Sequence, residues 1–382
     1  MNALLQSTLE HLKVLVGFDT RNPPRAIGKG GIFDYLRAQL PGFDVQVTDY
    51  GAGAVSLYAV RGEPKLLFNV HLDTVPDSPR WSASPFDLRM NGDRAVGLGA
   101  CDTKGAAAAL LAAANVSSGD MALLFTTDEE GADPRCVQTF LDVARSRVPG
   151  PRVPAFEAVI VAEPTRCKAV LAHRGIQSVW ACFEGQAGHA SGEQKATDSA
   201  LHQAVRWSAA ALDFAEAWSA ERFGGLHGMR FNLGRIEGGI KANMIAPAAE
   251  IRFGMRPLPS VDMDELLERL RALAEPAPTV FEETFRGLPL PADPATAESG
   301  MREARALAES FGMPVGDAVD FWTEAALFSQ AGYTTFVYGP GDIAQAHSAD
   351  EWVALAGLET AARMYLRITE QSAGPRARTR SA

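Results

Sequence analysis

The apolar positions of the chain form short runs that alternate with stretches of helical periodicity. The helical stretches lie at 104–114 and 136–147. The apolar runs carry β-branched and aromatic residues, which is typical of buried strands. They recur at 55–60, 66–70, 121–126 and 158–161. This alternation predicts an α/β domain with a mainly parallel or mixed sheet and helices on its faces.

A different pattern follows residue 173. Strand-like and helical stretches then come in the order βαββαβ, which describes a ferredoxin-like module. They lie at 176–184, 197–220, 229–237, 250–255, 263–274 and 280–285. We therefore expect a second domain, inserted into the first, at residues 174–288.

The first domain is expected to resume after the insertion. Three prolines between 289 and 294 mark the return, and a helical stretch at 295–311 precedes a strand at 335–338. The chain has 382 residues, of which 47% are hydrophobic. A chain of this length usually forms more than one hydrophobic core, which favours two domains. The expected bounds are 1–173 and 289–372 for the first domain and 373–382 for a disordered tail.

Ionisable residues directly follow three of the apolar runs. His71 and Asp73 follow the second run, three acids at 128–130 follow the third, and Glu163 follows the fourth. In open α/β sheets, ligands bind in the crevice beyond the carboxyl ends of the strands. We therefore expect these side chains to converge on one place.

His71 and Asp73 are two residues apart, so their side chains point to the same side of an extended strand end. A metal-bound imidazole usually donates its other ring nitrogen to a carboxylate or a carbonyl. Asp73 could orient His71 in this way, or it could form a hydrogen bond within the turn. Taken alone, the pair is better explained as a capped loop with a surface histidine.

Asp102 lies in the segment 99–105, which joins a predicted strand to the helix that starts after Lys104. Its carboxylate could simply cap that helix by accepting backbone N–H groups. However, Asp102 leaves its strand at the same edge of the sheet as His71. This shared position favours a role as a ligand.

Asp128, Glu129 and Glu130 are adjacent acids followed by Gly131. A solvated acidic turn is the usual explanation for such a cluster. Here the acids would lie in a crevice that other carboxylates already line, where they would repel one another without a cation. A divalent metal resolves this repulsion. One glutamate can bind it while its neighbour faces elsewhere and stays free as a base.

Together with His347, which lies in a glycine-rich loop, the candidate ligands comprise two histidines and three carboxylates. This mixture of nitrogen and hard oxygen suits zinc, manganese or cobalt rather than an iron–sulfur cluster or a thiolate zinc site. Two metals that share a carboxylate form a known hydrolytic device. Asp102 is the candidate for the shared carboxylate.

The ordered series of these residues closely resembles that of the two-zinc deacylases and exopeptidases. This family includes acetylornithine deacetylase, acetylcitrulline deacetylase, succinyl-diaminopimelate desuccinylase, aminoacylase and glutamate carboxypeptidase. The resemblance covers about residues 5–370 and departs from the family at 114–121 and 131–137, where the chain is short. It implies a mixed-sheet, zinc-exopeptidase-like catalytic domain with an inserted ferredoxin-like lid or dimerisation domain, and altered loops at the rim of the site.

The resemblance also implies roles for the candidate residues and two divalent ions, Zn or Co. One ion would be held by His71, Asp102 and Glu163, and the other by Asp102, Glu130 and His347. Glu129 would be the general base, Asp73 would belong to the catalytic set, and the peptide bond between Asp102 and Thr103 would be cis.

In the inserted domain, the segment 188–191 resembles the family segment whose histidine reaches the active site of a neighbouring subunit, which implies a homodimer with His189 acting in trans. Asn243 and Arg256 resemble the family's contacts to the substrate carboxylate. The planar fork of arginine suits a carboxylate bidentately, which is an independent physical reason.

The segments 321–325 and 337–341 look most like those of the acetylornithine and acetylcitrulline deacetylases, in which the first segment lines the pocket. Glu324 would suit the cationic end of ornithine, whereas the neutral ureido group of citrulline needs paired donors and acceptors. The compact form of the chain favours N-acetyl-L-citrulline as the substrate, a small N-acyl amino acid of arginine biosynthesis. N-acetyl-L-ornithine and succinyl-diaminopimelate are the alternatives.

Composition excludes several other classes. The formal net charge is −10, so the protein lacks the positive electrostatic potential that attracts polyanions, and we expect no nucleic-acid partner. The longest apolar runs fall short of the roughly 20 residues that span a bilayer, so we expect no membrane span. The N-terminus lacks the features of a secretion signal and the 4 cysteines are scattered, which favours the cytoplasm and reduced thiols.

Two alternatives from other classes remain. A non-catalytic binding protein could use the same scaffold, but it would be expected to have lost a ligand or Glu129, and both are present. A cysteine hydrolase could use Cys101 beside Asp102, but the sequence places no histidine to activate that thiol. Removal of metal with a chelator would leave a cysteine hydrolase active.

Overall fold

The computed structural model describes residues 2–131, 134–145, 153–193, 195, 197–273 and 275–372. Contacts divide the chain into two compact units. The first comprises Met1–Leu171, Arg302–Gly316 and Thr323–Ala382, and the second comprises Ala172–Met301 and Asp317–Trp322.

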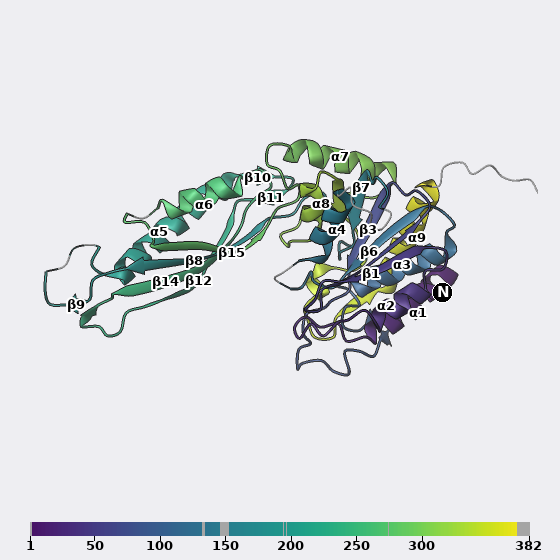
Figure 1. Ribbon diagram of the computed structural model, residues 1–382, viewed down its shortest axis with the longest axis horizontal. Coiled ribbons are helices and arrows are strands. Elements are labelled where there is room, and N and C mark those ends of the chain that lie inside the picture. Colours follow the sequence, from purple (N-terminus) through teal and green to yellow (C-terminus); the bar gives the residue numbers. More distant parts are fainter. Residues whose placement is uncertain are drawn as a thin grey trace, which may run out of the picture. The chain divides into compact units, whose positions relative to one another are not determined.

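A six-stranded mixed sheet forms the centre of the first unit (Figure 1). Its strands, in spatial order, are β1 (Asp44–Asp49), β2 (Val55–Arg61), β6 (Met121–Thr126), β3 (Leu66–His71), β7 (Ala158–Val161) and β16 (Thr334–Val337). The last four are parallel to one another, β2 runs antiparallel to its neighbour β6, and β1 runs antiparallel to β2. The fold class predicted from the sequence, α/β with a mixed sheet, is therefore confirmed.

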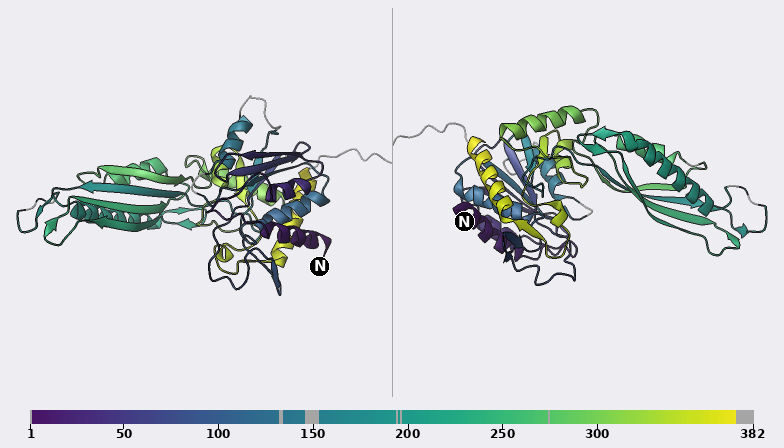
Figure 2. Two further views of the ribbon diagram at one scale, coloured as in Figure 1. Left: turned by 60° about the horizontal axis from the view of Figure 1, so that its bottom comes forward. Right: turned by 180° about the vertical axis from the view of Figure 1, so that it is seen from behind.

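Helices cover both faces of this sheet, which explains why its central strands are continuous apolar runs. Every residue of β3, β6 and β7 is buried. The helices α1 (Ala3–Val16), α3 (Lys104–Val116) and α9 (Leu355–Ser372) pack together on one face, and α4 (Cys136–Arg145) and α8 (Ala325–Gln330) lie on the other (Figures 1 and 2).

The alanine-rich sequence of α3 follows from its position between β3 and the helices α1 and α9. Its residues from Lys104 to Ala114 are all buried. Small side chains let neighbouring elements approach α3 closely on every side, so the interior packs without large voids. The N-terminus of α3 is thereby fixed beside the end of β3.

Smaller elements complete the first unit. A three-stranded antiparallel sheet orders residues before α3 and after His347, and one short helix and one single turn complete the set. These elements are α2 (Ile32–Ala38), β4 (Arg89–Asn91), β5 (Arg94–Val96), η2 (Ile343–Gln345) and β17 (Trp352–Ala354). Helix α7 (Ala297–Ser310) leads back into this unit from the second.

The second unit contains a four-stranded antiparallel sheet in the order β12–β14–β8–β15. Its elements follow the chain in the order βαββαβ, as the sequence predicted. They are β8 (Ile176–Glu184), α5 (Ala200–Ala217), β12 (Arg230–Gly238), β14 (Ala248–Arg256), α6 (Met263–Arg271) and β15 (Val280–Gly287). The short strands β9 (Gly188–His189), β10 (Arg222–Phe223), β11 (Leu226–His227) and β13 (Met244–Ile245) and the single turn η1 (Trp218–Ala220) lie in the connections.

One face of this sheet is covered by α5 and α6, and the burial of β8 and β14 accordingly alternates with a period of two. Trp207 of α5 is fully buried, lies 5.0 Å from the ring of Phe253 on β14, and donates its indole N–H to the carbonyl of Leu270 on α6. A single aromatic residue thus ties the two helices to the sheet.

The division into units differs from the expected domain bounds. Residues 289–301 and Asp317–Trp322 group with the second unit, although we expected the first domain to resume at 289. Residues 289–301 group there because the backbone N–H and carbonyl of Leu290 form hydrogen bonds with the backbone of His173, at the start of the second unit. The expected tail at 373–382 lies outside the described residues. No helix among the described residues is long and apolar enough to cross a membrane.

Candidate metal centre and active site

The parallel strands β3, β6 and β7 are neighbours, so their carboxyl ends lie at one edge of the sheet. His71 is the last residue of β3, the acids 128–130 follow β6, and Glu163 follows β7. Asp102 lies two residues before the first residue of α3, in a loop that this buried helix holds against the same edge of the sheet. The convergence expected from the sequence is therefore present.

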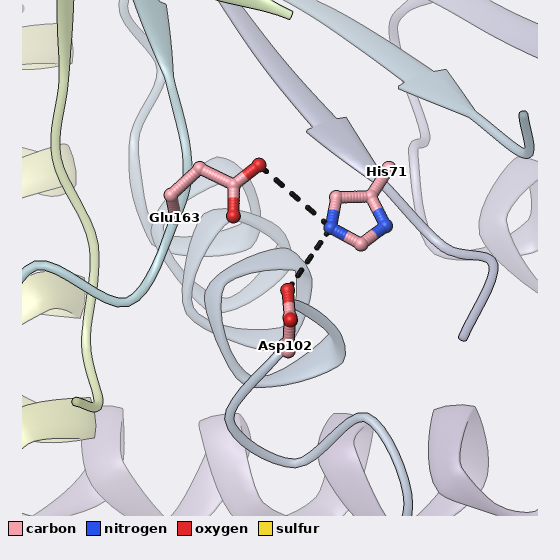
Figure 3. A group of neighbouring side chains, drawn as sticks. All are labelled: His71, Asp102 and Glu163. Atoms are coloured by element: carbon pink, nitrogen blue, oxygen red, sulfur yellow. Dashed lines mark hydrogen bonds and ion pairs between the residues drawn. The ribbon is translucent and has the colours of Figure 1, made fainter. Parts of the chain in front are cut away.

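The first group of ligand atoms consists of His71, Asp102 and Glu163, all of which are buried. His71 Nε2 lies 3.1 Å from Asp102 Oδ1 and 3.7 Å from Glu163 Oε1 (Figure 3). Glu163 Oε1 has no hydrogen-bond partner within the described part of the chain. A buried carboxylate oxygen without a donor fits a site that binds a cation.

The second group consists of Asp102, Glu130 and His347. His347 Nε2 lies 3.0 Å from Glu130 Oε1 and 3.4 Å from Asp102 Oδ2. The two oxygens of Asp102 therefore face two different histidines, which is the arrangement a shared ligand of two ions requires. His347 has a φ of +56°, so its loop holds this residue in the sparsely populated left-handed region.

Asp73 acts on both groups. Its carbonyl lies 3.0 Å from His71 Nδ1, and its Oδ1 lies 3.4 Å from the same nitrogen. Its Oδ2 accepts the backbone N–H of Glu130 at 3.0 Å and the amide of Asn22 at 2.9 Å. Asp73 thus orients the imidazole, which is one of the two roles that the sequence left open, and it also anchors the turn that carries Glu130, which the sequence did not indicate.

The three adjacent acids have three different environments. Asp128 is buried, and its Oδ2 accepts the backbone N–H groups of Arg135 and Cys136 at 2.6 and 2.8 Å, at the start of α4. Glu130 contacts His347, as described above. Glu129 is partly exposed and has neither a hydrogen bond nor an ion pair within the described residues. The expectation that all three acids line the crevice is wrong for Asp128, because the free N–H groups of α4 bind its carboxylate.

In the metal-free protein, the close approach of several acids and their burial shift the pKa values of the site residues. Burial raises the pKa of Glu129 and of Glu163 well above the usual range, and neighbouring acids add to the effect. Burial alone would lower the pKa of His71, but its hydrogen bonds to Asp102 and Asp73 raise it well above the usual value. Hydrogen bonds to Asp102 and Glu130 raise the pKa of His347 to about 10. Protons therefore balance the charge of the site when metal is absent.

Comparison with known proteins decides the family. The profile of Peptidase family M20/M25/M40 matches residues 67–371. This chain belongs to that peptidase family. The resemblance stated from the sequence is thereby confirmed, and the chain is a hydrolase that acts on amide bonds, as its relatives are.

Individual relatives include both deacetylases and peptidases. The N-acetyl-L-citrulline deacetylase of Xanthomonas campestris pv. campestris is 64% identical over 361 residues, which are 94% of this chain and 96% of that protein. The acetylornithine deacetylase of Vibrio vulnificus is 29% identical over 325 residues, or 82% of this chain and 83% of that protein. Among solved structures, the aminopeptidase PepT from Bacillus cereus has a TM-score of 0.69 at 18% identity and covers 96% of this chain and 98% of its own, which shows the shared fold.

Other features of this M20-family site agree with the sequence analysis or extend it. The peptide bond between Asp102 and Thr103 is cis, as the resemblance implied. The hydroxyl of Thr103 donates to the carbonyl of His71 at 2.6 Å, a contact between two ligand-bearing segments that the sequence did not indicate. Cys101 is buried and its thiol donates to the carbonyl of Asp342, while burial raises its pKa. A thiol in this state is a poor nucleophile.

Glu324, whose orientation the sequence left open, lies beneath the acidic turn at the start of α8. It is 1% exposed, and its Oε2 accepts the hydroxyl of Thr126, the last residue of β6, at 3.0 Å. Burial, together with the charge of Asp128, raises the pKa of Glu324 to about 8. Its Oε1 has no hydrogen-bond partner within the described residues.

The candidate site residues of the second unit lie in two separate places. Met244 in β13 pairs with His189 in β9, and the carbonyl of Asn243 accepts the N–H of Ala190 at 3.0 Å, so Asn243 and His189 are neighbours although they are far apart in sequence. Arg256 lies at the opposite end of β14. β14 runs from Ala248 to Arg256 and is about 26 Å long at ~3.3 Å per residue, and the His189–Asn243 place lies beyond its Ala248 end.

Metal binding is expected to release protons. At about pH 7, His347 and His71 carry protons in the metal-free protein, and each must lose its proton to donate a lone pair to an ion. Titration of the metal-free protein with Zn²⁺ in buffers of different protonation enthalpy should therefore show net proton release, and affinity should fall as the pH is lowered. His202→Ala, on the exposed face of α5, should leave the proton count unchanged. Binding without proton release would contradict this description of the site.

Proposed function

We propose that this protein is an N-acetyl-L-citrulline deacetylase that uses water to release acetate and L-citrulline. The observation that carries the proposal is the 64% identity to the Xanthomonas campestris enzyme of that name over 94% of the chain. The complete set of candidate ligands, with Glu129 unpaired within the described residues, supports it. Such a reaction on an intermediate of amino-acid biosynthesis fits the cytoplasmic setting that we expect.

Two divalent ions, Zn²⁺ or Co²⁺, suit the donor set, because each group offers one imidazole and two carboxylates within 4.8 Å of one another. His71, Asp102 and Glu163 would hold one ion, and Asp102, Glu130 and His347 the other. When bound, the ions would polarise the acyl carbonyl and lower the pKa of water at the site.

Glu129 is the proposed general base. It accepts a proton from the attacking water and then donates that proton to the leaving amine nitrogen, so the amide bond breaks without a free amide anion. Its lack of a partner among the described residues leaves both oxygens available for this transfer. Asp73 supports the step by holding the backbone of the adjacent Glu130.

Arg256 is the proposed contact for the substrate's α-carboxylate. It is half-buried, burial lowers its pKa, and within the described residues its guanidinium has no acidic partner. A partly desolvated cation without a partner gains most from an anionic ligand, and the guanidinium fork can bind a carboxylate bidentately. Selection for a free α-carboxylate follows from this contact.

The protonation state of Glu324 supports acetylcitrulline rather than acetylornithine as the substrate. With a pKa of about 8 in the metal-free protein, its carboxyl group is mostly neutral at pH 7, and its buried Oε1 has no hydrogen-bond partner within the described residues. A neutral carboxyl group can exchange hydrogen bonds with a ureido group, whereas the ammonium of ornithine would need a full negative charge to offset its desolvation.

The protein is proposed to act as a homodimer in which His189 and Asn243 complete the site of the other subunit. An N-acyl amino acid is about two residues long, or roughly 7 Å. It cannot reach both residues of one chain, because Arg256 is the last residue of β14 and His189 pairs with β13, which precedes the first residue of β14. His189 from a second copy could instead share the charge of the developing oxyanion.

A surface suitable for that second copy lies on the second unit. Strand β12 is an edge of its sheet and leaves backbone groups available for pairing. Beside it, α5 exposes Val205 and Leu212, which are 55% and 51% exposed, and β12 exposes Ile236, which is 48% exposed. Pairing of two β12 edges would cover these apolar side chains.

The substrate assignment is tested by a panel of N-acyl amino acids. Protein supplied with Zn²⁺ or Co²⁺ should release amine from N-acetyl-L-citrulline with a kcat/KM at least about tenfold higher than from N-acetyl-L-ornithine, because the neutral Glu324 does not compensate an ammonium group. Succinyl-diaminopimelate should be a poorer substrate still. The α-methyl ester of acetylcitrulline is the control for the carboxylate contact. Preference for acetylornithine would refute the assignment.

The division of roles between the two glutamates is tested by Glu129→Gln and Glu130→Gln. Loss of the base should lower kcat by about 10²- to 10⁴-fold with bound metal unchanged. Loss of a ligand should instead lower the metal content. Glu157→Gln, an exposed acid paired with Lys65, is the control and should alter neither quantity. Normal turnover by metal-loaded Glu129→Gln protein would show that the proposed base is wrong.

The trans arrangement is tested by coexpressing differently tagged, individually inactive variants and isolating the hybrid dimers. A hybrid of His189→Ala with Glu129→Ala should regain one working site of two, because Glu129 acts in its own subunit and His189 in the other. A hybrid of His189→Ala with Asn243→Ala should stay inactive, because both residues would serve the same distant site. Equal activity of the two hybrids would contradict the arrangement.

A further inference from the structure

Glu351 holds the loop that carries the shared ligand Asp102. Its side chain is buried, and its carboxylate accepts three backbone N–H groups of that loop. Oε2 accepts the N–H of Gly99 at 3.0 Å, while Oε1 accepts those of Cys101 and Asp102 at 2.8 and 2.9 Å. The backbone carbonyl of Glu351 also accepts the N–H of Gly97 at 3.0 Å.

A carboxylate is the side chain that this loop requires. The three buried N–H donors need two oxygen atoms, and a carboxylate supplies two acceptors and no donor. Glutamine would place its amide N–H₂ against one of the three donors and leave that donor without an acceptor. The placement of an acid so close to the anionic Asp102 is electrostatically costly, which argues for a function beyond filling space.

The same segment of chain also supplies a ligand directly. His347 lies four positions before Glu351, and Asp350 ties the segment to the rim by accepting the backbone N–H of Ser82 at 3.2 Å and the guanidinium of Arg89 at 2.8 Å. On the other side, Trp352 pairs with Val96 in the small sheet. Glu351 is therefore held by contacts of both neighbouring residues, four positions after His347.

We propose that Glu351 is a positioning residue that fixes the carboxylate of Asp102 between the two ligand groups. Through Glu351, one segment acts on two of the three residues of the second group: it carries His347 and holds the backbone of Asp102. This inference rests on the proposed two-metal function, because it concerns how tightly the ions are held. Glu351 itself donates no ligand atom to either group.

Zn²⁺ affinity of purified, metal-free protein tests the proposal. Glu351→Gln should bind Zn²⁺ about 10- to 100-fold more weakly than wild type, as is typical when a group that orients a ligand is lost. Glu351→Asp keeps both oxygens on a shorter stem and should lie between wild type and Glu351→Gln. Glu351→Asp also tests the proposal if the glutamine variant does not fold. Glu303→Gln, an exposed acid on α7, should match wild type.

A destabilised control separates positioning from general stability. Leu12→Ala removes a fully buried side chain from α1 and should lower the melting temperature of the metal-free protein without weakening Zn²⁺ binding. Weaker binding in both Glu351 variants but not in Leu12→Ala supports the proposal. Unchanged affinity, or an equal loss in Leu12→Ala, overturns it. Absence of Zn²⁺ binding by wild type would instead count against the proposed function.

Discussion

Carboxylates crowd one edge of the central sheet, and their mutual repulsion is the constraint on which the rest of the site depends. Asp102 faces both His71 and His347, while Glu163 is grouped with His71 in a buried place and Glu130 with His347 nearer the surface. Such anions need protons or cations between them. In the metal-free protein, raised pKa values of His71 and His347 supply the protons, and divalent ions can take their place.

The fold meets this constraint by giving each acid a separate attachment. Parallel strands bring their carboxyl ends to one edge, and the buried helix α3 holds Asp102 there. Asp73 binds the imidazole of His71 and the backbone of Glu130, while Asp128 turns away to cap α4. Glu129 is the acid of this turn that no described contact occupies, which is what a base for proton transfer requires.

The proposed substrate contacts of the second unit depend on a different constraint. Its sheet separates Arg256 from the His189–Asn243 pair by the length of β14, which exceeds any small N-acyl amino acid. A rigid antiparallel sheet therefore makes the proposed site depend on a second copy. The apolar side chains exposed along α5 and β12 are consistent with a partner at that face.

The sequence alone determined the fold class, the βαββαβ order and the ligand candidates, because burial periodicity and residue type at strand ends are local properties. It could not assign separate roles to Asp128, Glu129 and Glu130, since three adjacent acids differ only in the direction that the folded turn gives them. Nor could it place His189 beside Asn243, bury Glu324, or bring Glu351 to the Asp102 loop. These contacts join segments that are far apart in the chain, and tertiary packing alone decides which distant groups meet.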